Sequence, residues 1–199
     1  YFDRKIHYRK FFYAAQHAQH IIAISEQTKR DIIDYLKVPE SKITVVYQGC
    51  HQAFKQEYTK AEKAAVRAKY HLPERFVLNV GAIEPRKNAL EIVKAIAPLP
   101  DLSLVLVGAQ TAYYQQIEEY CKAHNLSDRV LALKGVSMQE LAMIYQQAEV
   151  FCYPSVFEGF GIPIIEALFS RVPVITSEGS CFAEAGGAHS CYISLDKAA

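Results

Sequence analysis

Two acidic residues, Glu158 and Glu166, stand eight positions apart in the stretch PSVFEGFGIPIIEAL (residues 154–168). The two glycines between them let the backbone approach a ligand closely, and the proline suits the first turn of a helix. The free N–H groups at the start of such a helix bind anions, while a carboxylate accepts hydrogen bonds from hydroxyl groups. The alternative is a solvated turn with ordinary surface glutamates.

A second candidate group is the basic pair Arg86 and Lys87 in the stretch GAIEPRKN (residues 81–88). A guanidinium offers two parallel donors and an ammonium offers a point charge, so the pair suits a diphosphate. Such a pair more often forms a solvated basic turn. The interpretation as a diphosphate site therefore depends on the residues around it.

Strand and helix signals alternate from residue 76 onward. The apolar runs 76–80, 102–108, 129–133, 150–154 and 172–177 are typical of buried strands, and helices are expected at 88–97, 112–124, 137–148 and 162–170. The pattern predicts an α/β fold, a Rossmann-like parallel sheet with helices on both faces. Ligands of such sheets bind at the carboxyl ends of the strands, where both candidate groups fall.

Two of these helices start with residues suited to capping. Asn88 precedes the helix at 88–97 and is expected to cap it. Ser137 and Glu140 form the Ser-x-x-Glu signature of a capping box before the helix at 137–148.

The first 52 residues have a different organisation. They predict an amphipathic first helix with Arg4, Lys5, Arg9 and Lys10 outward, a strand at 20–25, a helix from Ser25 and a strand at 42–49. Because this is too little to form a core alone, residues 1–52 are expected to be the end of another α/β domain. Residues 53–74 then form a linker and first helix, and 75–199 the ligand-binding domain, incomplete at its C-terminus.

Composition excludes several other classes. The net charge of +1 gives no global attraction for nucleic acid, and no apolar stretch is long enough to span a membrane. The five cysteines lack the spacing of a metal site and are expected to be reduced. No GxGxxG or GxxxxGK[ST] motif is present, which speaks against dinucleotide and P-loop chemistry.

Together the candidate residues predict a site for a nucleotide diphosphate that carries a sugar. Arg86 and Lys87 would meet the phosphates, Glu166 the ribose and Glu158 the second sugar. No acidic pair or His/Cys cluster accompanies them, so no metal is expected, and the two cations would supply the charge that a divalent ion supplies elsewhere.

The stretch from Glu158 to Glu166 resembles the E-x7-E motif of the GT4 group of retaining glycosyltransferases, which have the GT-B fold. GAIEPRKN resembles the diphosphate loop of that family. LVLVG, LKGVSMQEL, VPVITS, ISEQTKRDI and VVYQG also resemble family segments, so the likeness covers nearly the whole chain. It implies a donor-binding second domain, preceded by the tail of an acceptor-binding N-terminal domain.

By this resemblance Glu158 is the essential acid that contacts the transferred sugar, and Arg86 and Lys87 stabilise the leaving diphosphate. The donor site would comprise Gly81, Arg86, Lys87, Gly135, Val136, Glu158, Phe160, Gly161 and Glu166. Gly135 and Val136 would meet the base, and Glu166 would hold the ribose.

The resemblance also implies metal-independent transfer of a hexosyl group with retention of configuration, in polysaccharide or glycoconjugate synthesis. It implies no cofactor, a GDP- or UDP-linked donor, and a saccharide or lipid-linked saccharide acceptor bound through the absent domain. The expected location is the cytoplasm or, with peripheral contact, the inner face of the membrane. The chain alone is expected to be inactive.

Three positions depart from the family pattern. Arg171 stands where the family commonly has glycine, Gln48 where it has asparagine, and Ala183 where it has proline. Two other functions are consistent with the residues: a non-catalytic nucleotide-sugar module that needs a separate acceptor partner, and a flavodoxin-like regulatory domain. The latter requires clustered acids after the first strand of the sheet, where only Glu84 is near.

Overall fold

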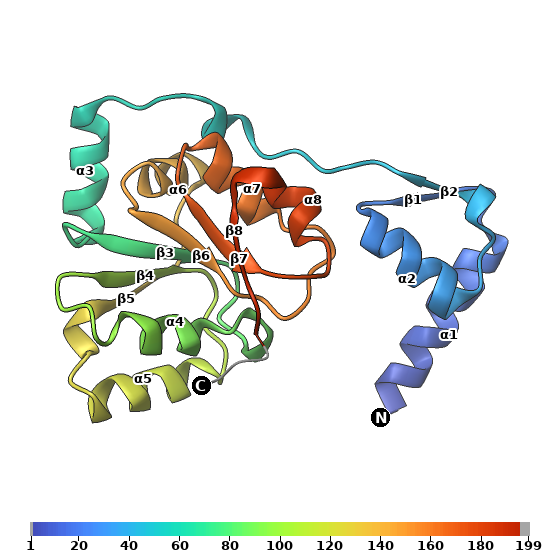
Figure 1. Cartoon of the computed structure of the whole chain (residues 1–199), viewed down its shortest axis with the longest axis horizontal. Coiled ribbons are helices and arrows are strands. Elements are labelled where there is room, and N and C mark those ends of the chain that lie inside the picture. Colours follow the sequence, from blue (N-terminus) through green and yellow to red (C-terminus); the bar gives the residue numbers. More distant parts are fainter. Residues whose placement is uncertain (1, 196–199) are drawn as a thin grey trace.

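The computed structural model of the chain describes residues 2–195, which form two lobes joined by an extended segment at residues 46–51 (Figure 1). The smaller lobe has two helices, a two-stranded parallel sheet and a short 3-10 turn. Its elements are α1 (Phe2–His17), β1 (Ile21–Ala23), α2 (Glu26–Leu36), η1 (Glu40–Lys42) and β2 (Ile43–Val45).

The larger lobe is built on a six-stranded parallel sheet. Its strands are β3 (Phe76–Val80), β4 (Ser103–Val107), β5 (Val130–Leu133), β6 (Val150–Tyr153), β7 (Val174–Ser177) and β8 (Cys191–Ile193). They are ordered β5-β4-β3-β6-β7-β8, so β3 lies in the middle, and Val77 pairs with Leu104 on one side and Val150 on the other. This is the strand order of a Rossmann-type sheet.

Helices cover both faces of this sheet, as the sequence predicts. They are α3 (Lys60–Tyr70), α4 (Ala89–Ile96), α5 (Tyr114–Ala123), α6 (Met138–Tyr145), α7 (Ile162–Phe169) and α8 (Phe182–Gly186), with the 3-10 turns η2 (Gln52–Lys55), η3 (Pro85–Lys87), η4 (Ser127–Arg129) and η5 (Gly187–His189). One core cluster lies under α3, α6, α7 and α8, and another under α4 and α5. Leu78 faces the first cluster and its neighbour Val77 the second, as the two-residue period of a strand requires.

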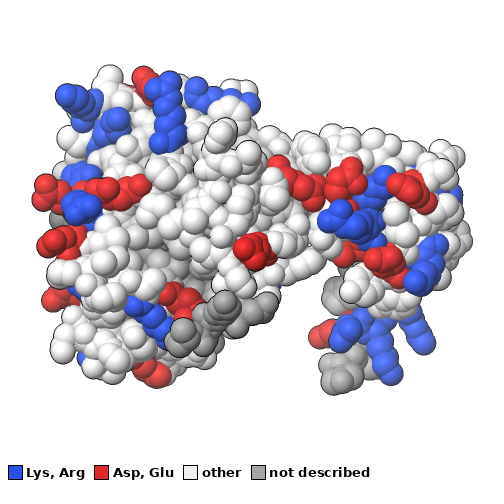
Figure 2. Space-filling model, in the orientation of Figure 1, with Lys and Arg blue, Asp and Glu red and all other residues white. Residues whose placement is uncertain are grey.

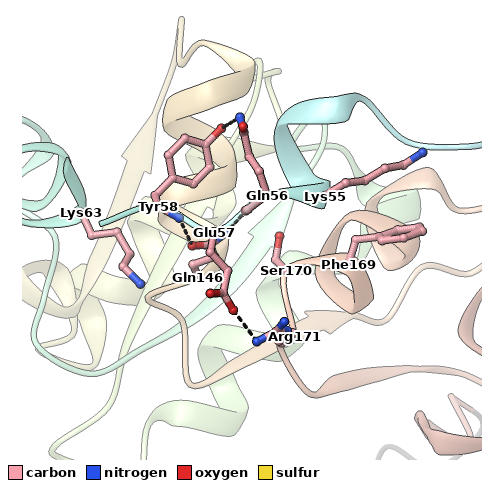
Figure 3. Close-up of a pocket in the computed structure, with 9 residues that line it drawn as sticks. All are labelled: Lys55, Gln56, Glu57, Tyr58, Lys63, Gln146, Phe169, Ser170 and Arg171. Atoms are coloured by element: carbon pink, nitrogen blue, oxygen red, sulfur yellow. Dashed lines mark hydrogen bonds and ion pairs between the residues drawn. The ribbon is translucent and has the colours of Figure 1, made fainter. Parts of the chain in front are cut away.

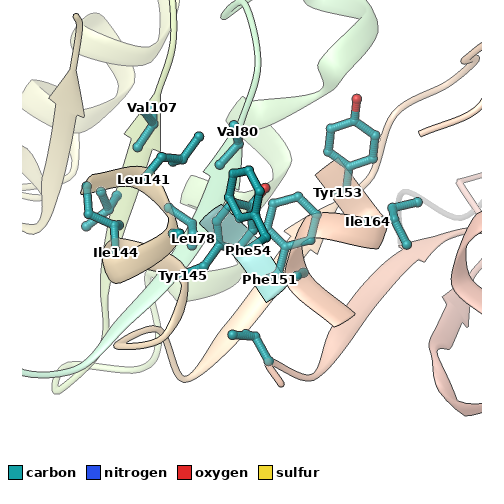
Figure 4. Close-up of a cluster of buried hydrophobic side chains, with 14 of the residues drawn as sticks. Phe54, Leu78, Val80, Val107, Leu141, Ile144, Tyr145, Phe151, Tyr153 and Ile164 are labelled. Carbon is teal, nitrogen blue, oxygen red and sulfur yellow. The ribbon is translucent and has the colours of Figure 1, made fainter. Parts of the chain in front are cut away.

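The first core cluster contains several aromatic rings (Figure 4). The rings of Phe54 and Tyr145 meet edge to face at 5.6 Å between centroids, and Tyr145 also contacts Phe151. Phe54 belongs to the segment expected to be a polar linker, and its side chain is fully buried in the larger lobe. The linker therefore begins to pack as soon as it reaches this lobe.

Helix starts follow the sequence with one exception. Ser137 and Glu140 form the expected capping box, as do Thr59 and Glu62, and Ser25 caps α2. Asn88 is the N-cap residue of α4, as predicted, but its side chain makes no capping hydrogen bond. Its backbone is left-handed (φ 59°), a conformation that asparagine tolerates and that turns the chain from η3 into α4.

Helix α1 exposes its basic side chains, as expected, and Figure 2 shows Lys and Arg gathered on this part of the smaller lobe. It also exposes aromatic rings, with Phe11 64% and Tyr13 65% accessible, so it is not the amphipathic helix that the sequence suggested. No described helix has the length and apolar character needed to cross a membrane.

Candidate functional site

The candidate site lies where the strand order of the large sheet reverses. From β3 the chain proceeds outward to β4 and β5, and then returns to β6 on the other side of β3. The loops that follow β3 and β6 diverge in such a sheet and leave a crevice at their carboxyl ends. Here these loops are residues 81–88 and 154–161, which carry both candidate groups.

Backbone contacts hold the two loops together. The N–H of Val156 donates to the carbonyl of Arg86 at 2.9 Å, and the Arg86 guanidinium donates to the carbonyl of Phe157 at 2.7 Å. The loop after β6 is thereby placed against the loop after β3.

The structure brings Arg86, Lys87 and Glu158 together in this crevice. Glu158 Oε1 lies 2.6 Å from Lys87 Nζ and 2.7 Å from the Arg86 guanidinium. The same oxygen accepts a 3.1 Å hydrogen bond from the Tyr153 hydroxyl, which also contacts Lys87 Nζ. Lys87 is buried, with 8% of its surface accessible, and its ammonium contacts both of these partners.

Arg86 bridges two carboxylates. Its other terminal nitrogen lies 2.6 Å from Glu84 Oε1. Two cations and two carboxylates make the cluster formally neutral. An anionic ligand would therefore compete with these carboxylates for the two cations.

The pKa of Glu158 lies below its ordinary value. Burial opposes its ionisation, but hydrogen bonds from Lys87 and Arg86 outweigh that effect. The pKa of Arg86 is raised: burial acts to lower it, and the bonds to Glu158 and Glu84 prevail. The ion pair is therefore fully charged at neutral pH.

Glu166 has a different hydrogen-bond partner from the residues of this cluster. It is buried on α7, with 8% of its surface accessible, and Oε2 accepts a 3.1 Å hydrogen bond from the Tyr145 hydroxyl. Burial raises its pKa, and the bond from Tyr145 offsets this only partly. Among the described residues its side chain makes no hydrogen bond or ion pair with Arg86, Lys87 or Glu158. The pKa values of the two carboxylates of this motif are thus shifted in opposite directions, that of Glu158 down and that of Glu166 up.

The glycines and Phe160 shape the crevice. A side chain at Gly81 would press on Lys87, because its Cβ would lie 3.3 Å from Lys87 Cε. Gly161 starts α7 with φ 101°, which favours glycine. Phe160 is buried and stacks on Tyr47 at 5.5 Å, so its side chain contacts the segment that joins the lobes.

Gly135 and Val136, expected at the base, lie in the loop between β5 and α6. Gly135 is exposed and has φ 68°, and Val136 is half-buried against the first core cluster. No contact joins either residue to the crevice cluster in the described part of the chain.

Two tyrosines of the site and a contact between the lobes were not predicted from the sequence. Tyr153 and Tyr145 were indistinguishable from core residues, because each stands in an apolar segment. Ser25 Oγ donates to the carbonyl of Gly159 at 2.7 Å, and Thr28 Oγ1 donates to the same oxygen at 3.1 Å. The only signal for this contact was the position of Ser25 as a helix cap.

Glu184 completes the interlobe contact from α8. Its carboxylate accepts the backbone N–H groups of Glu26 at 2.6 Å and Gln27 at 3.0 Å. These are orphan donors at the positive end of α2, a favourable place for an anion. The two lobes are therefore joined at the loop that carries Glu158.

Within residues 2–195, no three His, Cys, Asp or Glu side chains are grouped so that they could hold a metal ion. All five cysteines are free thiols. The positive charge of the crevice is supplied by Arg86 and Lys87.

The strand order, the helices on both faces and the crevice at the centre define an α/β protein of the Rossmann type. The chain belongs to the glycosyl transferases group 1 family, whose model matches residues 62–190. The model for glycosyltransferase family 4 matches residues 2–53. The fold is that of GT-B glycosyltransferases, as the sequence predicts.

Several known proteins are similar along most of the chain. The O-antigen chain mannosyltransferase RfbU of Salmonella typhimurium is 31% identical over 197 residues, which are 98% of this chain and 52% of RfbU. The D-inositol 3-phosphate glycosyltransferase of Mycolicibacterium smegmatis is 26% identical, over 80% of this chain and 38% of that protein. The chain thus spans about half the length of such relatives.

A solved structure has the same fold. The Anabaena protein HepE, in complex with UDP and glucose, superposes with a TM-score of 0.80 at 19% identity, covering 91% of this chain and 50% of HepE. This similarity shows the fold alone.

Proposed function

We propose that this chain is the donor-binding part of a retaining glycosyltransferase that transfers a hexosyl group from a nucleotide-diphosphate sugar. The observation that carries the proposal is the contact of Glu158 with Arg86 and Lys87 in the crevice at the centre of the sheet. The structure of HepE with UDP and glucose supports a nucleotide-linked donor. The O-antigen mannosyltransferases among the relatives support a role in polysaccharide synthesis.

The donor would exchange partners with Glu158. Its diphosphate takes the ammonium of Lys87 and the guanidinium of Arg86, and Glu158 is released to accept a hydrogen bond from a hydroxyl of the sugar. As the glycosidic bond breaks, negative charge grows on the departing diphosphate, and the two cations are already in place to stabilise it. Preorganised charge of this kind supports transfer without a metal ion.

Glu166 would hold the ribose. A buried carboxylate with a single donor, Tyr145, keeps acceptor capacity for the two ribose hydroxyls. It lies on α7, the helix that begins directly after the loop of Glu158. Gly135 and Val136 remain the residues proposed to meet the base.

The acceptor belongs to the proposal as well. Because the chain spans about half of its relatives, we propose that a saccharide or lipid-linked saccharide acceptor binds to a larger N-terminal domain, of which residues 2–45 are one part. Catalysis by the chain alone is not expected, and the cytoplasmic location remains a prediction from the sequence.

Calorimetric titration of the chain with UDP, GDP and ADP tests the donor site. We expect one diphosphate to bind best, and the double variant Arg86→Gln with Lys87→Gln to weaken its affinity at least tenfold, the effect of losing a charge-assisted hydrogen bond. The control, Arg75→Gln with Lys94→Gln, removes two cations that form exposed ion pairs elsewhere. Equal affinities of the two double variants would refute the site.

Turnover separates the enzyme from a non-catalytic nucleotide-sugar module. In the protein with its complete acceptor domain, Glu158→Gln is expected to reduce transfer strongly without weakening nucleotide affinity, which can only rise because the carboxylate that competes for Arg86 and Lys87 loses its charge. The anomeric proton of the product, observed by NMR, reports whether configuration is retained. An active Glu158→Gln enzyme, or a product of inverted configuration, would overturn the mechanism.

A further inference from the structure

The ring of Tyr153 is held by the core, at the border between the core and the crevice. Tyr153 is the last residue of β6 and is 1% accessible. Its ring stacks on that of Phe151 at 5.6 Å between centroids, and its carbonyl accepts a 2.9 Å hydrogen bond from the Thr176 hydroxyl on the neighbouring strand β7. Figure 4 shows the Tyr153 hydroxyl directed away from the ring of Phe151. The sheet, and not the loops of the crevice, therefore sets the position of this hydroxyl.

The hydroxyl of Tyr153 links the two ends of the ion pair. It contacts Lys87 Nζ and lies 3.1 Å from Glu158 Oε1. An ammonium has only donors and an ionised carboxylate has only acceptors, so the direction of each hydrogen bond is fixed. Lys87 donates to the hydroxyl oxygen, and the hydroxyl donates its own proton to Glu158.

The hydroxyl of Tyr153 stays protonated while Glu158 is ionised. Burial raises the pKa of Tyr153 most, and the negative charge of Glu158 raises it further. The pKa of Glu158 is shifted the other way, below its ordinary value. Tyr153 is therefore a donor to the carboxylate throughout the neutral range of pH.

The ring of Tyr153 also contacts the lysine. The Lys87 ammonium lies over the face of this ring, 4.6 Å from its centroid. A phenylalanine ring in the same place would keep that cation–π contact and the stacking on Phe151. Replacement of Tyr153 by phenylalanine therefore removes the two hydrogen bonds of the hydroxyl and little else.

Tyr153 differs from the other partners of Glu158 because it carries no charge. Glu158 Oε1 lies 2.6 Å from Lys87 Nζ and 2.7 Å from the Arg86 guanidinium. In the proposed function both cations turn to the diphosphate of the donor. The Glu158 side chain, which is 12% accessible, then loses its two charged partners and gains freedom to rotate. A neutral hydroxyl fixed by the core is not drawn to the diphosphate in this way, so it stays with the carboxylate.

We propose that Tyr153 is a positioning residue for Glu158. Its hydroxyl holds Oε1 while the diphosphate occupies Lys87 and Arg86, and so directs Oε2 toward a hydroxyl of the transferred sugar. This role rests on the proposed function, because it requires a donor that competes for the two cations. Tyr153 touches neither the phosphates nor the sugar and acts through the carboxylate.

Kinetics of Tyr153→Phe test this role in the protein with its complete acceptor domain. A Glu158 that can turn away meets the sugar less often in the productive orientation. We therefore expect kcat to fall about tenfold, the effect of one hydrogen bond to a charged group. KM for the donor and nucleotide affinity are expected to change less than about twofold, because the cations keep their places. An unchanged kcat, or a loss confined to KM, would overturn the role.

Tyr58→Phe is the matched control. The Tyr58 hydroxyl also accepts one hydrogen bond, from Gln56 at 2.8 Å, and donates one, to the carbonyl of Ala53 at 3.2 Å. Figure 3 shows it beside Gln56 at a cavity of about 350 Å³, which residues 169–171 also line at the amino ends of the strands, away from the crevice. This variant is expected to keep its kcat and KM. If both tyrosine variants lose kcat equally, Tyr153 has no positioning role.

The titration of Glu158 gives a readout that a loss of packing would not move. Carboxyl carbon NMR follows it, with Glu158→Gln to assign the signal. A hydrogen bond donated to the ionised form lowers a pKa, so Tyr153→Phe is expected to raise the pKa of Glu158. The rise is expected to be larger with a saturating nucleoside diphosphate, the tightest binder among UDP, GDP and ADP, since Tyr153 is then the donor that remains. A rise that is no larger with the nucleotide than without it would refute the role.

Glu158→Gln separates failure of this role from failure of the proposed function. If Glu158→Gln is inactive and Tyr153→Phe retains its full kcat, the proposed function stands and Tyr153 does not position the carboxylate. If Glu158→Gln is itself active, the proposed mechanism fails, and the role of Tyr153 fails with it.

Discussion

Ser25 Oγ donates a 2.7 Å hydrogen bond to the carbonyl oxygen of Gly159, a residue 134 positions further along the chain. The same hydroxyl oxygen accepts the N–H of Thr28 and so caps α2. One side chain thus starts a helix of the smaller lobe and fixes the loop of the larger lobe that carries Glu158.

Ser25→Ala should therefore have two effects on stability. Loss of the helix cap lowers the free energy of unfolding by about 1 kcal/mol, and loss of the bond to Gly159 by about 1 kcal/mol more. Urea unfolding measures the sum. Thr59→Ala is the control, because it removes the cap of α3 without an interlobe bond. If the two variants lose equal stability, the bond to Gly159 contributes nothing.

Lys87→Met should raise the pKa of Glu158. The largest bond that favours the carboxylate is lost, while the burial that opposes it remains. Carboxyl carbon NMR measures the pKa directly. Stability should fall by about 2 kcal/mol at pH 7, because a buried carboxylate loses a partner. In the variant, ionisation of Glu158 costs stability as the pH rises through its raised folded pKa. The loss of stability relative to the unsubstituted protein should therefore be smaller near pH 4 than at pH 7.

Lys94→Met is the matched control for Lys87→Met. It breaks the exposed pair of Lys94 with Glu91 and should change stability by less than about 0.5 kcal/mol at either pH. A Glu158 pKa that does not move in Lys87→Met would contradict the proposed balance of burial and ion pairing.

Tyr145→Phe should raise the pKa of Glu166 further. The hydroxyl of Tyr145 is the one side-chain group that lowers it against the effect of burial. For a carboxyl with a raised folded pKa, the associated stability is complete below the ordinary value and is lost as pH rises through the folded value. The variant should therefore lose more stability at pH 7 than at pH 4, as measured by urea unfolding. The control Tyr70→Phe removes a hydroxyl bonded to Glu140 and should leave the titration of Glu166 unchanged.

Gly108→Ala should prevent stable folding or destabilise the protein by more than about 4 kcal/mol. An added Cβ would lie 2.0 Å from the carbonyl oxygen of Gly81, at the carboxyl ends of two adjacent strands. That contact is with backbone, so no side chain can move aside. Gly49→Ala is the control: its Cβ would meet nothing within 4 Å, and thermal unfolding should change by little. A folded Gly108→Ala protein of ordinary stability would show that the two strands can separate.

The strands of the large sheet were predicted from the sequence more completely than the contacts between loops and between lobes. Continuous apolar runs specify buried parallel strands, so all five expected strands are present, and β8 was missed because Cys191–Ile193 is short and followed by polar residues. Arg86 and Glu158 both follow the carboxyl ends of strands, after β3 and β6, as predicted. The ion pair between them depends on loop geometry, which has no periodic signal. The contact between Ser25 and Gly159 depends on the relative position of the two lobes. The residues next to Ser25 and next to Gly159 in the sequence carry no information about that position.

The neutral cluster in the crevice has a consequence for the speed of binding. A cleft with bare cations draws in an anion from a distance, and its association rate then falls steeply with added salt. Here Glu158 and Glu84 already act as internal counterions. A nucleotide that binds here as proposed would meet little long-range attraction from this cluster, and its association rate is expected to depend only weakly on ionic strength.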